Sequence, residues 1–171
     1  YRFRDVLALV SEGGRDGFID TDGNYVIKLA DRVDYASFSD GYALIRKGNK
    51  WGFIDKKGNI VIKPAFYGAA DFKEGFASIM EKVGDKYLSG YINKKGKMIT
   101  KAIYEEVDDF QEGMACVKKN GKYGFINKKG KLVVNAIYDN AFSYENGLAY
   151  VAKGSNAYFI DKTGKKVITI K

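Results

Sequence analysis

Carboxylates are the main candidates for acid–base chemistry in this sequence of 171 residues. The chain contains no histidine, which removes the commonest general base and excludes Ser–His and Cys–His nucleophile pairs. Glu105 and Glu106, or Asp108 and Asp109, could in principle hydrolyse a glycosidic bond, because that reaction uses two carboxyl groups. Their place in a charged connecting segment favours solvated surface charges, and we expect no enzymatic activity.

The single cysteine excludes an internal disulfide framework and a cysteine-based metal cluster. Cys116 occupies a position where equivalent segments of the chain have Leu, Ser or Tyr, which predicts a packed and unreactive thiol. Neither a P-loop nor a strand-linked Gly-x-Gly-x-x-Gly motif occurs. We therefore expect no metal site and no cofactor.

Lysine clusters are the most conspicuous charged feature of a chain with a formal net charge of +8. They follow an Asp or Asn that recurs along the chain, and the candidate binding lysines are Lys56, Lys57, Lys94, Lys95, Lys128 and Lys129. Carboxylates are concentrated in other segments, so stacked units would carry two stripes of opposite sign. Such charges protect turns and edges from aggregation, and a polyanion-binding stripe is the alternative.

Two aromatic residues, Trp51 and Tyr123, are candidates for contact with a partner. They precede a recurrent glycine at a position where the other copies have Asp16, Ser89 and Ala157. A variable position on a repeated framework is a place where partner contacts can differ. Specific nucleic-acid binding is disfavoured, because arginine is scarce and the lysines lie on turns rather than among aromatics.

One short sequence recurs five times and indicates a repeat architecture. It reads Gly-Phe-Ile-Asp at 17–20 and 52–55, Gly-Tyr-Ile-Asn at 90–93, Gly-Phe-Ile-Asn at 124–127 and Tyr-Phe-Ile-Asp at 158–161. Each copy starts an Asp/Asn-x-x-Gly turn between segments rich in Phe, Tyr, Ile and Val, which is typical of a β-hairpin.

A second recurrent sequence, Phe-x-Asp/Glu-Gly-x-Ala-x-Val/Ile, predicts another strand before each hairpin. Together the two sequences divide the chain into units of about 34 residues at 3–37, 38–71, 72–109, 110–143 and 144–171. Each unit is expected to form a three-stranded antiparallel sheet. The segments between units have apolar residues three positions apart, which favours a helical turn or an irregular loop.

The even spacing predicts one all-β domain over residues 1–171, because repeat units bury their apolar faces against their neighbours. An open, solenoid-like stack is the first expectation, and a closed five-unit ring resembling a propeller is the alternative. The first copy is degenerate, with Val6 at the glycine position, and the chain begins at Tyr1. We therefore expect a piece of a longer protein.

Residues 50–79 resemble the bacterial WG, or KWG, repeat almost position by position. They read Lys-Trp-Gly-Phe-Ile-Asp-x-x-Gly-x-x-Val-Ile-x-Pro, followed by Phe-x-x-Ala-x-x-Phe-x-Glu-Gly-x-Ala. The chain departs from that pattern at Val6, at Tyr158, which replaces the hairpin glycine, and in retaining only Pro64 of the prolines.

The resemblance implies a β-repeat scaffold of bacterial surface, periplasmic or secreted proteins, without general enzymatic activity or a cofactor. It supplies no catalytic residues. We therefore expect a monomeric, non-catalytic module that binds a protein or a cell-envelope glycan, with polyanion adhesion as the alternative. No apolar run approaches the roughly 20 residues that a membrane-spanning helix needs, so we expect no membrane span.

Overall fold

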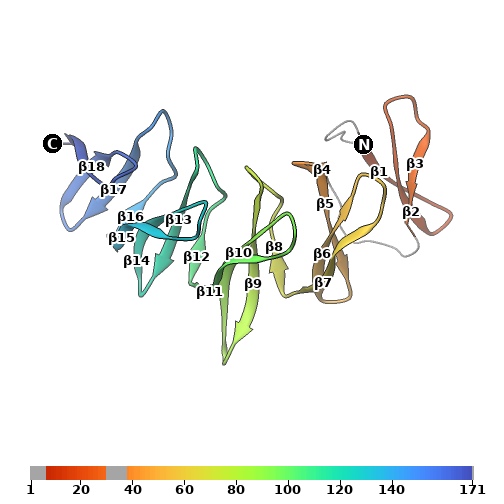
Figure 1. Cartoon of the computed structure of the whole chain (residues 1–171), viewed down its shortest axis with the longest axis horizontal. Helices are drawn as coiled ribbons and strands as arrows, with labels where there is room; N and C mark the ends of the chain where they lie inside the picture. The colour runs from red at the N-terminus through yellow and green to blue at the C-terminus, as the bar shows by residue number, and fades with distance from the viewer. Residues whose placement is uncertain (1–6, 30–37, 171) are drawn as a thin grey trace.

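The chain forms a row of small antiparallel β-sheets (Figure 1). The computed structural model describes residues 7–29 and 38–170, and all regular secondary structure in these two ranges is β-strand. The prediction of an all-β chain is confirmed. The degenerate first copy at Phe3 and the connecting segment at 30–37 lie outside the described residues. Within the described ranges no helix is long and apolar enough to cross a membrane.

The first sheet has three strands, and the second has four in the order β4-β5-β6-β7. The strands of the first sheet are β1 (Ala8–Glu12), β2 (Arg15–Ile19) and β3 (Tyr25–Lys28). Those of the second are β4 (Phe38–Ser39), β5 (Tyr42–Lys47), β6 (Lys50–Asp55) and β7 (Ile60–Phe66).

The remaining three sheets have the same four-stranded meander. The third contains β8 (Gly68–Ala69), β9 (Phe76–Val83), β10 (Lys86–Asn93) and β11 (Met98–Tyr104). The fourth contains β12 (Glu106–Val107), β13 (Met114–Lys119), β14 (Lys122–Asn127) and β15 (Leu132–Tyr138). The fifth contains β16 (Asn140–Ala141), β17 (Ala149–Lys153), β18 (Asn156–Ile160) and β19 (Lys166–Ile170).

The expectation of three-stranded units is wrong for these four sheets, because each has a short fourth strand at one edge. In the last three sheets this strand comes from the segment predicted to be a helical turn or irregular loop. There the amide of Tyr67 donates to the Met80 carbonyl at 2.9 Å, and that of Ala70 to Ser78 at 3.0 Å. Pairing with the next sheet satisfies backbone groups of the connecting segment that would otherwise lack partners.

The hairpin turns are closed by the recurrent Asp or Asn. At Asp55, Oδ1 accepts the Lys57 amide at 2.8 Å and the Asn59 amide at 2.9 Å, and the Asp55 carbonyl accepts the Gly58 amide at 3.0 Å. Because both Asp and Asn can accept these bonds, Asn93 and Asn127 form the same turn without the charge.

The recurrent glycine before the hairpin is required by a close approach of two backbones. A Cβ atom at Gly124 would lie 2.5 Å from the Val134 carbonyl oxygen, opposite a bulge that interrupts the pairing of β14 with β15. In the fifth sheet Tyr158 pairs directly with Thr169 and no bulge interrupts the ladder there. The uninterrupted ladder accommodates the tyrosine side chain of the fifth copy.

Aromatic rings join each sheet to the next. At each junction a ring from the middle of one sheet meets the ring that opens the following repeat. The pairs are Phe18 with Phe38 at 4.8 Å, Phe53 with Phe72 at 4.7 Å, Tyr91 with Phe110 at 5.1 Å and Phe125 with Tyr144 at 4.9 Å between centroids. These edge-to-face contacts lie in four buried clusters, so the apolar core runs between sheets along the row.

The row is open, and the predicted alternative of a closed ring is wrong. The sheet of β1–β3 lies at one end and the sheet of β16–β19 at the other, and no described strand of one pairs with the other (Figure 1). One face of the last sheet is left uncovered by the described residues. Phe142 and Ile168 are 59% and 49% exposed there. Val134, the counterpart of Ile168 in the fourth sheet, is 4% exposed.

Candidate binding surfaces

Two of the six candidate hairpin lysines, Lys94 and Lys128, form ion pairs with the preceding sheet. Lys94 Nζ lies 2.8 Å from Asp40 Oδ1, and Lys128 Nζ lies 3.0 Å from Glu74 Oε2. Lys162 repeats the contact with Glu112 at 3.1 Å. In the third, fourth and fifth sheets the first lysine after the turn Asp or Asn therefore connects adjacent sheets. The prediction that Lys94 and Lys128 contact a partner stays a prediction, and both lysines also bind a carboxylate of the preceding sheet.

The same carboxylates also accept backbone amides of the next sheet. Asp40 Oδ2 accepts the Gly75 amide at 2.7 Å, Glu74 Oε2 accepts the Gly113 amide at 2.9 Å, and Glu112 Oε2 accepts the Gly147 amide at 2.9 Å. We call each such carboxylate, with its lysine and its glycine amide, an inter-sheet clamp. The clamps follow one another along the row at Asp40, Glu74 and Glu112.

The clamps hold their carboxyl groups in the charged form. Partial burial acts to raise the pKa of Asp40, but the hydrogen bonds from Lys94 and Gly75 outweigh it and lower the pKa below 3.8. The balance at Glu74 is the same, with Lys128 and the Gly113 amide lowering its pKa below 4.5. At Glu112 the hydrogen bond from Lys162 is the main cause of the lowered pKa. The favourable interactions are therefore lost when these groups are protonated.

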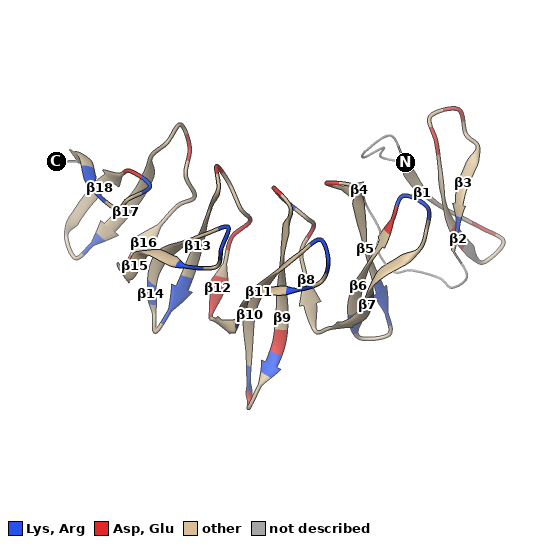
Figure 2. Ribbon diagram, viewed as in Figure 1, with Lys and Arg blue, Asp and Glu red and all other residues tan. Residues whose placement is uncertain are grey.

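The second lysine of each hairpin tip points into solvent. Lys57, Lys95 and Lys129 are exposed, and no carboxylate of the described chain forms an ion pair with them. Lys56 is also exposed at its tip. Figure 2 shows Lys and Arg on the hairpin loops and Asp and Glu on turns along the upper side of the row. The two predicted stripes thus exist, but part of each is used for contacts between sheets.

Trp51 and Tyr123 occupy equivalent positions in different sheets and do not form one site. Each lies opposite a cationic residue of the neighbouring strand, Arg46 for Trp51 and Lys118 for Tyr123. The distances from the cation to the ring centroid are 5.7 and 5.1 Å. Both rings are partly buried, so each has one side against the sheet junction.

Tyr123 is engaged within its own sheet. Its hydroxyl donates to Glu106 Oε2 at 2.6 Å, and Lys118 Nζ lies 2.6 Å from Glu106 Oε1. Lys118 and then Tyr123 lower the pKa of Glu106, while the hydrogen bond to Glu106 raises the pKa of Tyr123. These contacts indicate a structural role for Tyr123.

Trp51, in contrast, lines a surface hollow of about 440 Å³ at the junction of the second and third sheets. The other lining residues are Arg46, Asn49, Tyr67, Met80 and Tyr87. Tyr67 and Tyr87 are 42% and 52% exposed and meet edge to face with centroids 5.4 Å apart. Lys50 Nζ lies 3.1 Å from the Tyr67 ring centroid. The hollow therefore combines exposed aromatic faces with nearby positive charge.

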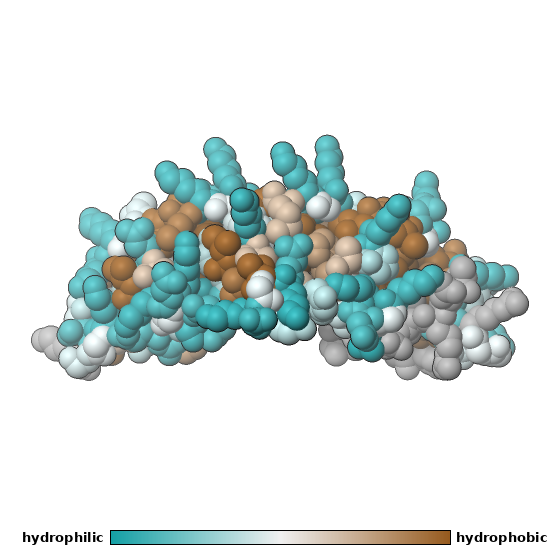
Figure 3. Space-filling view, turned by 90° about the horizontal axis from the view of Figure 1, so that it is seen from below, coloured by the Kyte–Doolittle hydropathy of each residue, from teal (hydrophilic) through white to brown (hydrophobic). Residues whose placement is uncertain are grey.

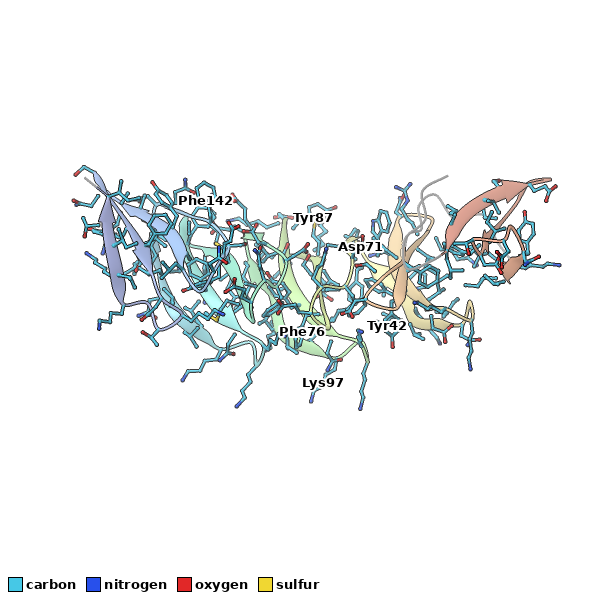
Figure 4. All side chains as sticks on the ribbon, turned by 90° about the horizontal axis from the view of Figure 1, so that it is seen from above. Tyr42, Asp71, Phe76, Tyr87, Lys97 and Phe142 are labelled. Atoms are coloured by element: carbon cyan, nitrogen blue, oxygen red, sulfur yellow. The ribbon has the colours of Figure 1, made fainter. Side chains whose placement is uncertain are left out.

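The hollow depends on a local extension of the repeat. Strands β9 and β10 are each 8 residues long, and their hairpin projects beyond the neighbouring hairpins (Figure 1). The extension carries Tyr87 and exposes Met80. Sequence reasoning did not identify Tyr67, Met80 or Tyr87, although the 38-residue interval between the second and third copies marks the extension. Figure 4 shows that Tyr87 lies on the opposite edge of the row from Lys97.

Three of the four carboxylates considered for hydrolysis, Glu105, Glu106 and Asp108, accept hydrogen bonds from neighbouring groups. Cys116 is buried, and burial, followed by the charges of Asp108 and Glu106, raises its pKa to about 12. Glu105 accepts the Gly121 amide at 2.9 Å, and Asp108 Oδ2 accepts the Ser143 hydroxyl at 3.2 Å. Across residues 7–29 and 38–170 no three metal-ligating side chains form a group.

Comparison with known protein families identifies the family of this chain. The model of the WG containing repeat matches residues 17–51, 51–87, 90–123 and 123–156. The matches cover most of the chain, which therefore belongs to the WG repeat family, as its resemblance predicted. No curated protein matches the chain.

Solved structures share the fold at low sequence identity. Hsv2p of Kluyveromyces lactis is 13% identical, with a TM-score of 0.55 over 92% of this chain and 59% of that chain. The same yeast protein with loop 6CD replaced by a Gly-Ser linker is 14% identical, with a TM-score of 0.52 over 98% of this chain and 63% of that one. The chain thus spans about three fifths of these structures. At such identity the likeness concerns the fold alone.

Proposed function

We propose that the chain is a non-catalytic binding module whose partner, a protein or a cell-envelope glycan, contacts the hollow around Trp51, Tyr67 and Tyr87. The observation that carries this proposal is the exposure of both tyrosines beside Met80, which is 38% exposed. Exposed aromatic clusters next to polar groups are typical of binding sites, since burying them on a partner removes a large apolar area from water.

The framework supports binding rather than catalysis. The repeat family and the row of sheets suggest a scaffold, and three of the four carboxylates weighed for hydrolysis bind neighbouring backbone and side-chain groups. The extended β9–β10 hairpin departs from the repeat at the place where the hollow forms. A departure confined to one junction is suited to recognition of a partner at that junction.

Fluorescence of the chain provides a direct test, because Trp51 is its only tryptophan and lines the hollow. We expect peptidoglycan-derived oligosaccharides, or peptides selected from a display library on the immobilised chain, to change the Trp51 emission on titration. Tyr87→Ser should weaken that binding about tenfold, as for a central interface aromatic. Phe142→Ser is the matched control, since Phe142 is a similarly exposed aromatic at the end of the row.

Two outcomes contradict the proposal. The first is the absence of any ligand that changes Trp51 emission among the glycans and the selected peptides. The second is a ligand that binds with equal affinity to the unchanged chain and to the Tyr87→Ser variant.

A further inference from the structure

A row of lysines runs along the edge of the molecule that is opposite the hollow. We define the outer-edge lysine row as six exposed side chains, Lys63, Lys95, Lys97, Lys101, Lys129 and Lys131. None forms an ion pair with a carboxylate of the described chain. They belong to the outer strands β7 and β11 and to the hairpin tips of the third and fourth sheets.

Negative charge is absent from the elements that carry this row. Strands β7, β11, β15 and β19 contain no Asp or Glu. The third and fourth hairpins have Asn93 and Asn127 where the other copies have Asp20, Asp55 and Asp161. The exchange keeps the turn hydrogen bonds but removes a charge that would partly neutralise the adjacent lysines.

Packing makes the row continuous from sheet to sheet. Each hairpin tip rests on the outer strand of the preceding sheet, and an added Cβ atom at Gly96 would lie 3.3 Å from Cγ1 of Ile62. The corresponding atom at Gly130 would lie 2.1 Å from the carbonyl oxygen of Ile99. Lys95 and Lys97 therefore lie beside β7, and Lys129 and Lys131 lie beside β11.

The shape of this edge restricts the kind of anion that fits it. Figure 3 shows an arched molecule with hydrophilic side chains projecting from its convex edge, and apolar side chains between them. Figure 4 shows Lys97 among long side chains that project away from the sheets. A flat membrane or a straight duplex would touch few lysines on a convex edge, whereas a flexible linear polymer could follow it.

We propose that the outer-edge lysine row binds a linear anionic polysaccharide. Lysine ammonium groups attract anionic groups as point charges, and the regular repeat supplies them at intervals along one line. Ile103 and Ile137 are 40% and 43% exposed on β11 and β15, where they can contact the faces of sugar rings. β11 and β15 present no exposed aromatic side chain for base stacking, which distinguishes this edge from a single-stranded nucleic-acid site.

Two matched variants test the proposal. The row variant changes Lys97, Lys101, Lys129 and Lys131 to Gln. The control variant changes Lys82, Lys86, Lys119 and Lys153, which are exposed on the other hairpins, to Gln. Each loses four charges, so the formal net charge falls from +8 to +4 in both. Any difference in affinity between the two variants is therefore caused by the position of the lysines and not by net charge.

Binding is measured with heparin and with polygalacturonate in buffers of about 50 mM and about 200 mM salt. We expect the row variant to lose about tenfold or more in affinity and the control variant to lose much less. The dependence of log K on log salt should also become shallower in the row variant, because fewer counterions are released when it binds.

Equal losses in the two variants would overturn the proposal, because net charge alone would then explain binding. Failure of the unchanged chain to bind either polysaccharide at the lower salt would also overturn it. Tighter binding to single-stranded DNA or to vesicles containing phosphatidylserine would reject a polysaccharide as the partner. The hollow around Trp51 and Tyr87 lies on the other edge, so failure of this proposal would not affect the proposed function, which is tested separately.

Discussion

Gly124 shows how one residue sets the geometry of a whole repeat. Its Cα faces the backbone of the bulge in β15, and a Cβ would lie 2.5 Å from the Val134 oxygen and 2.7 Å from the Ala136 nitrogen. Neither atom can move without disturbing the ladder between β14 and β15. The recurrent glycine of this chain is thus a requirement of strand pairing rather than of turn formation.

Replacement of Gly124 by Ala should destabilise the chain by roughly 2–4 kcal/mol, because the added methyl group overlaps backbone atoms that are fixed by pairing. The measurement is the free energy of unfolding from denaturant titration. Gly121→Ala is the control. Gly121 has a φ of +73° but nothing within 4 Å of an added Cβ, so only about 1 kcal/mol of backbone strain is expected. Equal losses at the two positions would refute the close-approach explanation.

Among the elements, the inter-sheet clamps link turns that are far apart in sequence. Glu74 accepts the amides of Glu112 and Gly113 and binds Lys128, so one carboxylate contacts two elements of the next sheet. The contact with Lys128 spans 54 positions in sequence. The clamp at Asp40 is built in the same way from Gly75 and Lys94. Stacking of sheets is therefore reinforced at the surface by charge as well as in the core by aromatic rings.

Glu74→Gln should lower the thermal unfolding midpoint at neutral pH, because it removes the charge that Lys128 and two amides bind. The pKa of Glu74 is lower in the folded chain than its ordinary value of 4.5. Its carboxylate therefore stabilises the fold above that pH, and this contribution disappears as the pH falls through the folded value. The unchanged chain and the variant should therefore approach the same midpoint once the pH is below the folded pKa of Glu74.

The control for this prediction is Glu145→Gln, which alters an exposed carboxylate outside the clamps. It should leave the midpoint nearly unchanged, as is usual for surface charges. A difference between the unchanged chain and Glu74→Gln that stays constant from neutral to acidic pH would show that the charge of Glu74 does not stabilise the stack.

The sequence predicted local structure better than contacts between sheets. Asp55 and Gly58 predict a turn reliably because the hydrogen bonds that close it join residues within five positions of each other. A strand of two residues such as β8 has no periodicity to detect. Among the described residues Lys94 forms an ion pair and Lys95 does not, because stacking of the sheets places Asp40 beside Lys94. Asp40 is 54 positions away in the sequence, so local patterns do not predict this contact. Tyr67 and Tyr87 likewise meet only across a junction.

For the molecule as a whole, the open row means that the last sheet is less buried than the inner sheets. In the inner sheets Phe53, Tyr91 and Phe125 are completely buried because the next sheet supplies a ring to cover each of them. Phe159 is their counterpart in the fifth sheet. Among the aromatic rings of the described residues it meets only Tyr150 of its own sheet, at 6.0 Å between centroids, and it is partly exposed. In a stack held together by neighbour contacts, a sheet covered on one face is less stable than one covered on both.

Hydrogen exchange should therefore be fastest in the last sheet among the described four-stranded sheets. Amides of β17 and β18 should exchange with lower protection than those of β13 and β14, although both pairs form full antiparallel ladders. The reason is that opening the fifth sheet exposes one apolar junction, whereas opening the fourth exposes two. Exchange measured by mass spectrometry or NMR distinguishes the two pairs.

A pair of substitutions provides a second comparison of the fifth sheet with the fourth. Because the Ile168 side chain is already 49% exposed, Ile168→Ala should lower the free energy of unfolding much less than Val134→Ala, which removes a side chain buried between sheets. Uniform protection along the row, or equal costs for the two substitutions, would show that the last sheet is covered as fully as the inner ones.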